Sequence, residues 1–136
     1  MKRLLALDIG DVRIGIAVCL NPLGIVSPHS VYVRTKSIRA DVKNIADIIA
    51  ANRIETVVVG LPESEDPGQA QKNTAFAERL ARRSGMPPFR YWNEAYTTAE
   101  AESELIGMGR SRQKRSRVID RSAAALILES YIRSGE

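Results

Sequence analysis

Apolar and polar positions follow a strand-like period in the first third of the chain. Short apolar or alternating runs, rich in β-branched residues, are separated by turn residues such as Gly10 and the stretch Asn21-Pro22-Leu23-Gly24. This pattern predicts strands over residues 2–8, 14–19 and 25–33. Because the connections between these segments are short, we expect the three strands to pair antiparallel.

From residue 38 onward the apolar period becomes helical. Ile38, Val42, Ile45, Ile48 and Ile49 recur at helical spacing with polar residues between them. Further along, we predict strands over 56–59 and 89–93 and helices over 69–84, 97–107 and 118–132. An antiparallel start followed by alternating helices and strands predicts one α/β domain over residues 1–136, with a mixed five-stranded central sheet flanked by helices.

The composition agrees with a single domain that folds without covalent staples. The chain has 136 residues, of which 44% are hydrophobic, and this is enough to bury a substantial core. Its one cysteine, Cys19, excludes an internal disulfide. Asp8 interrupts the apolar run near the N-terminus, and we find neither a signal peptide nor a membrane span. We therefore expect a cytoplasmic protein with no membrane partner.

The positive charge is concentrated in one segment. The net charge is +4, and residues 110–117 contain no acidic residue. Positive potential of this kind attracts polyanions such as nucleic acids. A solvated surface loop is the alternative interpretation. The basic residues of this segment, which we call the basic segment, are Arg110, Arg112, Lys114, Arg115 and Arg117.

Three acidic residues are hard to explain as ordinary surface positions. Asp8 follows a buried strand, Glu94 follows the last strand, and Asp120 lies near the start of an almost wholly apolar helix. We expect the strands before Asp8 and Glu94 to lie side by side, with the final helix bringing Asp120 across the sheet. Three clustered carboxylates repel one another unless a divalent cation neutralises them. Individually, Asp8 could cap its turn through Gly10, Asp120 could be a helix N-cap, and Glu94 could be a surface residue.

A carboxylate cluster of this kind is suited to phosphodiester hydrolysis. Oxygen ligands select Mg²⁺ or Mn²⁺. Two such ions roughly 4 Å apart can activate water and stabilise the leaving oxygen, so no side-chain nucleophile is needed. The only imidazole is His29, and we expect a structural role for it in its turn.

Four motifs, in order along the chain, together resemble those of the YqgF/RuvX family of bacterial Holliday-junction-resolvase-like proteins. They are Asp8-Ile-Gly-Asp-Val-Arg-Ile-Gly-Ile-Ala-Val18, Asn21-Pro22-Leu23-Gly24, Val59-Gly60-Leu61-Pro62 and Asp120-x-x-Ala-Ala-x-x-Ile-Leu-Glu-Ser-Tyr131. The resemblance covers nearly the whole chain. It implies a ribonuclease H-like fold and a metal-dependent nuclease, often assigned to maturation of the 5′ end of 16S ribosomal RNA. It also implies that Asp8, Glu94 and Asp120 are the catalytic, metal-binding acids. Family members have also been proposed to cut four-way DNA junctions.

The chain departs from the family pattern around Glu94. The family's Asp-Glu-Arg-hydrophobic-Ser-Thr stretch is Asn93-Glu94-Ala95-Tyr96-Thr97-Thr98 here. If the missing arginine holds substrate phosphate, another cation must replace it. We expect nucleic-acid contacts from Arg13 and from the basic segment.

Two other classes of function compete with a nuclease. Asp8-x-Gly10 followed by Gly15 resembles the phosphate loop of actin-like kinases, but those proteins enclose nucleotide between two such domains and no second motif appears here. A non-catalytic nucleic-acid-binding module would explain the basic segment but not the acids. The residues do not distinguish RNA from DNA; the family resemblance favours RNA. Whether the protein is a homodimer, as junction resolvases are, stays open.

Overall fold

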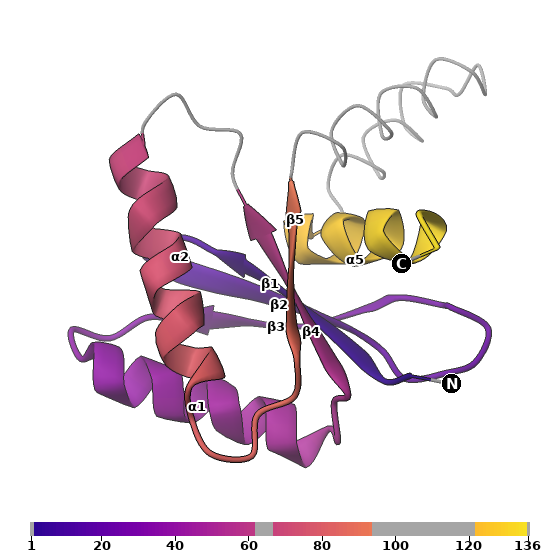
Figure 1. The fold of residues 1–136 in the computed structure, drawn as a ribbon, viewed down its shortest axis with the longest axis horizontal. Helices are drawn as coiled ribbons and strands as arrows, with labels where there is room; N and C mark the ends of the chain where they lie inside the picture. The colour runs from indigo at the N-terminus through magenta and orange to yellow at the C-terminus, as the bar shows by residue number, and fades with distance from the viewer. Residues whose placement is uncertain (1, 62–66, 94–121, 136) are drawn as a thin grey trace.

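The computed structural model describes residues 2–61, 67–93 and 122–135. Five strands and three helices lie in these ranges, and Figure 1 shows their arrangement. The strands are β1 (Leu4–Ile9), β2 (Arg13–Cys19), β3 (Ser27–Val33), β4 (Thr56–Leu61) and β5 (Phe89–Asn93). The helices are α1 (Ile38–Ala51), α2 (Pro67–Ala81) and α5 (Ala123–Arg133).

The strands form one mixed sheet in the order β3-β2-β1-β4-β5. β1 pairs antiparallel with β2, and β2 pairs antiparallel with β3, as the short connections predicted. β4 is parallel to both β1 and β5. The predicted mixed five-stranded sheet with flanking helices is therefore confirmed.

Helices cover both faces of this sheet, with α1 and α2 on one face and α5 on the other (Figure 1). Alternate residues of β1 divide between the two layers because successive strand side chains point to opposite faces. Leu5 and Leu7 pack in one cluster with Ile45 of α1, whereas Ala6 packs with Leu128 of α5. β1 is thus covered on both faces, and a polar residue on it needs a specific explanation.

The expectation that the first and last strands lie side by side is wrong, because β4 lies between β1 and β5. Val57, Val58 and Val59 are fully buried, so consecutive residues of β4 bury side chains on both faces. Such a strand needs neighbours on both edges and layers on both faces. β5 contains only partly buried and exposed residues, and it occupies the edge of the sheet.

The bounds of two helices also differ from their predictions. α2 extends from Pro67 to Ala81 and not over 69–84, and its early start agrees with the preference of proline for the first turn of a helix. α5 begins at Ala123 rather than at Val118, since the Ser122 hydroxyl accepts a hydrogen bond from the Ala125 amide as the N-cap. The predicted helix over 97–107 lies outside the described residues. Among the helices that are described, none is long and apolar enough to cross a membrane.

Candidate functional site

Asp8 lies near the carboxyl end of β1, on the face covered by α5. It pairs across the ladder with Gly15 of β2. A Cβ atom placed on Gly15 would lie 3.6 Å from the Cβ atoms of both Asp8 and Ala124, which is ordinary van der Waals contact. Ala124 is in the first turn of α5. The start of α5 therefore lies close to the strand end that carries Asp8, with room at position 15 for no more than a small side chain.

The carboxylate of Asp8 has no partner among the described residues. Asp8 is half-buried, and its side chain forms neither a hydrogen bond nor an ion pair within that part of the chain. The amide of Gly10 donates to the carbonyl of Arg13 at 2.9 Å, so the β1–β2 turn closes without Asp8. The turn-cap explanation of Asp8 is wrong. A half-buried carboxylate with no donor among the described residues is suited to a hydrated divalent cation.

Trp92 fixes the end of β5 against α5. Its indole Nε1 donates to the Ser130 hydroxyl at 2.9 Å, and its ring meets Tyr131 edge-on with 5.7 Å between centroids. Trp92 is paired with Gly60 of β4. The β1–β4 register pairs Leu7 with Val59, so the next residues, Asp8 and Gly60, are level. Asp8, Gly60 and Trp92 thus form one row across three strands, and two strand spacings of about 4.8 Å separate its ends.

Gly60, in the middle of this row, has no side chain on the α5 side of the sheet. No Gly60 side chain therefore stands between Asp8 and β5 on this face. Glu94 follows Asn93, the last residue of β5, and Asp120 precedes the α5 cap Ser122 by two positions. Glu94 and Asp120 themselves lie outside the described residues, as do all five residues of the basic segment. The suggested N-cap role of Asp120 is not needed, because Ser122 caps α5.

Arg13 is the one predicted nucleic-acid contact that the structure describes. It is the first residue of β2, it is exposed, and it pairs with Val33. Arg13 and Gly15 are two residues apart on the same strand, so their positions share the α5 face with Asp8. A phosphate held near Asp8 would thus find a cation on the same face. Within the described ranges, no three His, Cys, Asp or Glu residues gather into a metal-binding group.

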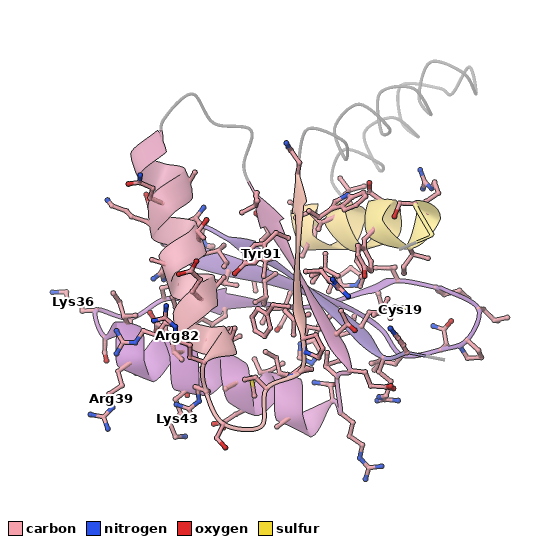
Figure 2. The ribbon with its side chains drawn as sticks, in the orientation of Figure 1. Cys19, Lys36, Arg39, Lys43, Arg82 and Tyr91 are labelled. Carbon is pink, nitrogen blue, oxygen red and sulfur yellow. The ribbon has the colours of Figure 1, made fainter. Side chains whose placement is uncertain are left out.

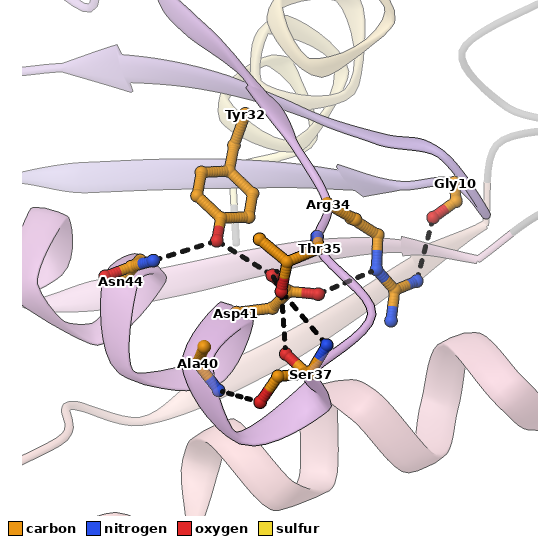
Figure 3. A network of polar contacts seen from close by, with 8 residues as sticks. All are labelled: Gly10, Tyr32, Arg34, Thr35, Ser37, Ala40, Asp41 and Asn44. Carbon is orange, nitrogen blue, oxygen red and sulfur yellow. Dashed lines mark hydrogen bonds and ion pairs between the residues drawn. The ribbon is translucent and has the colours of Figure 1, made fainter.

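Sequence reasoning missed a buried carboxylate on the opposite face, Asp41 of α1, which Figure 3 shows. Asp41 is fully buried. Its Oδ1 accepts from the Tyr32 hydroxyl at 2.8 Å, from the Thr35 hydroxyl at 2.9 Å and from the Thr35 amide at 3.0 Å. Its Oδ2 lies 3.6 Å from Nε of Arg34. In the sequence, Asp41 is an acid next to the apolar stripe of a helix. An acid in the first turn of a helix is common at exposed positions, so this signal did not indicate burial.

The network around Asp41 fixes the turn that follows Asp8. Nη1 of Arg34 donates to the carbonyl of Gly10 at 2.9 Å, so the ion pair links α1 to the β1–β2 turn. Burial raises the pKa of Asp41, but the hydrogen bonds from Thr35 and Tyr32 and the charge of Arg34 outweigh it and hold the pKa below its ordinary value. Asp41 is therefore ionised at neutral pH and supports the site from the far side of the sheet.

Sequence comparison gives matches along nearly the whole chain. A family profile described as "RuvX: Holliday junction resolvase" matches residues 2–134. A protein of Desulforamulus reducens is 36% identical over 136 residues, covering 98% of each chain. One of Syntrophus aciditrophicus is 41% identical over 133 residues, covering 96% of this chain and 87% of the relative. Both relatives carry the name "Putative pre-16S rRNA nuclease".

Comparison with solved structures finds the same fold at low sequence identity. RuvC of T. thermophilus, in complex with a Holliday junction substrate, aligns with a TM-score of 0.65 and 14% identity, covering 99% of this chain and 97% of that one. The Holliday junction resolvase of fowlpox virus aligns with a TM-score of 0.54 and 13% identity, covering 97% and 99%. These similarities show the fold alone, a RuvC-like arrangement of the ribonuclease H type.

Proposed function

The chain belongs to the RuvX family, and on this ground we propose that it is a metal-dependent nuclease that processes the 5′ end of precursor 16S ribosomal RNA. The observation that carries the proposal is the half-buried carboxylate of Asp8, which has no donor among the described residues and lies beside the start of α5. Asp8, Glu94 and Asp120 are the proposed metal-binding acids. In this proposal they meet at the carboxyl end of β1 and β4.

The donor set fits the proposed cation. Carboxylate oxygens are ligands that Mg²⁺ and Mn²⁺ prefer, and when bound such ions would activate water and offset charge on the reacting phosphate. Asp8 would hold the cation from β1, level with Gly60 of β4, which has no side chain of its own. Arg13, on the same face, would meet the substrate phosphate. Its position supports a role in place of the family arginine, where this chain has Ala95.

RNA is the proposed substrate because both relatives are named for a precursor of 16S ribosomal RNA. A four-way DNA junction is the second candidate, and it is favoured by the description of the family profile. A binding module without catalysis is the remaining alternative.

Cleavage assays separate the three functions. We would incubate the protein with RNA carrying the precursor 16S 5′ end, and separately with a four-way DNA junction, each with Mn²⁺, Mg²⁺ or EDTA. The Asp8→Asn variant tests the site, and Asp47→Asn, an exposed acid on α1, is the matched control. We expect metal-dependent RNA cleavage that falls at least about 100-fold in Asp8→Asn, a loss typical of removing charge stabilisation at a reacting centre. The control should cleave normally.

Two outcomes would contradict the proposal in different ways. Cleavage of the DNA junction alone would establish the nuclease but replace its substrate. Binding without cutting, in every metal, would replace the enzyme by a binding module.

A further inference from the structure

A cationic pocket lies on the face of the sheet opposite to Asp8. Its volume is about 430 Å³, and it lies between the β1–β2 turn, the segment leading into α1, and α2. We call it the α2 pocket. The lining side chains used below are Asp11, Arg34, Ile38, Lys72, Phe76 and Arg79.

The charge of the pocket is unbalanced toward the positive. Lys72 and Arg79 are seven residues apart on α2 and therefore lie on one side of the helix. Both are exposed, and neither forms an ion pair with any residue in the described ranges. Arg34 also lines the pocket, although its charge is paired with that of Asp41, and Asp11 is the single acid of the lining. Positive groups gathered in this way repel one another unless an anion joins them.

Arg34 is held in a fixed position in the lining of this pocket. Its guanidinium lies over the ring of Phe76, 4.7 Å from the centroid, and its side chain is only 16% exposed. Nε faces Asp41, and Nη1 donates to the carbonyl of Gly10. A guanidinium has five N–H groups, so these two contacts leave further donors for a ligand. A rigid arginine with spare donors is well suited to the oxygens of a phosphate.

The packing of the fold explains Arg34 but not its two neighbours. Arg34 is needed to neutralise Asp41 and to hold the β1–β2 turn. Lys72 and Arg79 have no such task, because they are exposed and unpaired within the described part of the chain. Two other exposed cations pair with acids four residues away along the chain, Lys43 with Asp47 and Arg82 with Glu78. What distinguishes Lys72 and Arg79 is their position, because both line the pocket that also contains Arg34.

We propose that the α2 pocket binds a backbone phosphate of the nucleic-acid strand at a position next to the bond that is cut. The identity of the strand rests on the proposed nuclease function. Asp8 and Asp11 are three residues apart, and three residues of chain span at most about 11 Å. The β1–β2 turn thus connects Asp8 to the pocket lining, and a nucleic-acid strand that passes over the end of β1 can contact both. Contacts of this kind fix the position of the strand and carry no sequence information.

The test is the salt dependence of RNA binding without cleavage. All proteins carry Asp8→Asn, EDTA is present, and the probe is a fluorescently labelled RNA with the precursor 16S 5′ end, followed by anisotropy. The pocket variant is Lys72→Gln with Arg79→Gln, two exposed positions whose replacement leaves the Arg34–Asp41 pair intact. The control is Lys43→Gln with Arg53→Gln, which removes the same charge. Lys43 projects from α1 away from the sheet (Figure 2), and Arg53 follows the far end of that helix.

We expect the pocket variant to bind at least about tenfold more weakly than the control. The slope of log K against log salt should become shallower by about 0.7 to 0.9 for each phosphate contact removed. Equal affinity and slope in the two variants would overturn the proposal. A calorimetric titration with inorganic phosphate and with a mononucleotide distinguishes the source of the phosphate. The contrary outcome is that one of these small anions binds tightly through Lys72 and Arg79 while RNA binding is independent of the two residues. In that case the pocket binds a free anion, and the proposal of a nucleic-acid strand is wrong.

Cleavage by proteins with Asp8 intact separates this proposal from the nuclease proposal. We expect the pocket variant to raise KM more than it lowers kcat, because a positioning contact acts mainly on substrate binding. If cleavage is found and the pocket variant cleaves with the KM of the control, the pocket proposal fails while the nuclease stands. If no protein cleaves but RNA binding still depends on the pocket, the nuclease fails while the pocket stands.

Discussion

Replacement of Asp41 by asparagine tests the buried network behind the candidate site. The change keeps the size of the side chain and removes its charge. Oδ1 could still accept from Tyr32 and Thr35, but the new amide N–H groups would face the guanidinium of Arg34. We expect Asp41→Asn to destabilise the protein at neutral pH, because the lowered pKa of Asp41 means that folding favours its ionised form.

The expected loss is about 2 to 4 kcal/mol. A hydrogen bond to a charged group contributes about 1.5 to 3 kcal/mol and a neutral one about 1, so three bonds to Oδ1 lose up to several kcal/mol. Removing one partner of a buried ion pair costs about 3 to 5 kcal/mol. That figure applies only in part here, since Arg34 is 16% exposed and lies 3.6 Å from Oδ2. The neutral asparagine does not have to be buried as a charge, and this offsets part of the loss from the hydrogen bonds and from the ion pair. The remaining loss corresponds to a fall in Tm of about 10 °C.

Urea unfolding of both proteins at a series of pH values measures this loss. A carboxyl group with a lowered folded-state pKa contributes stability above its unfolded pKa, near the ordinary value of 3.8, and loses it as the pH falls through the folded value. The difference between the wild type and Asp41→Asn should therefore be constant above about pH 5 and shrink below about pH 4. An Arg34→Gln variant and the double variant complete a cycle, in which we expect the two losses to be strongly non-additive.

Either of two results would refute this reasoning. The first is a difference in the free energy of unfolding between the two proteins below about 1 kcal/mol at pH 7. It would mean that the three hydrogen bonds to Oδ1 are hardly stronger with a carboxylate than with a neutral amide. A difference that does not change between pH 6 and pH 3 would mean that the charge of Asp41 is not its source.

Substitutions at two positions and one labelling experiment test the packing of the fold. Trp92→Phe should cost about 1 to 2 kcal/mol in urea unfolding, because it leaves the buried Ser130 hydroxyl without its donor; an unchanged midpoint would contradict the contact. Gly15→Ala should be tolerated, whereas Gly15→Val should lower the free energy of unfolding by about 1 to 3 kcal/mol through overlap with Ala124. Equal melting temperatures of these two variants would refute this. Cys19 is 3% exposed and should react with a thiol reagent only on unfolding; rapid labelling of the native protein would show that its strand opens.

Local patterns predicted most of the described elements. The turn residues around Gly10 and Pro22 set the first three strands, and the apolar stripe from Ile38 to Ile49 set α1 within two residues of its observed end. The boundary of α5 was less well predicted, because an apolar run continues through Val118 and Ile119 before the cap at Ser122. A hydroxyl that caps a helix is a local signal, and it was hidden here by the stronger apolar one.

Strand order and the Asp41 network depend on contacts between distant segments. β4 lies between β1 and β5, and its residues Val57, Val58 and Val59 are buried on both faces. The continuous β-branched run predicted a buried strand here but not its neighbours in the sheet. The partners of Asp41 come from β3 and the segment after it, and no spacing rule connects them. Of the candidate acids, sequence reasoning identified Asp8, and the structure places it at a strand end beside the first turn of α5. Glu94 and Asp120 remain predictions.

A calorimetric titration with Mn²⁺ tests the proposed metal site most directly, because it measures binding in the absence of any substrate. We would compare the wild type with Asp8→Asn, Glu94→Gln and Asp120→Asn, and with Asp47→Asn as the control. We expect the three site variants to lose at least about tenfold in Mn²⁺ affinity while the control binds as the wild type does. Equal affinity in all five proteins would contradict the claim that these three acids hold the metal.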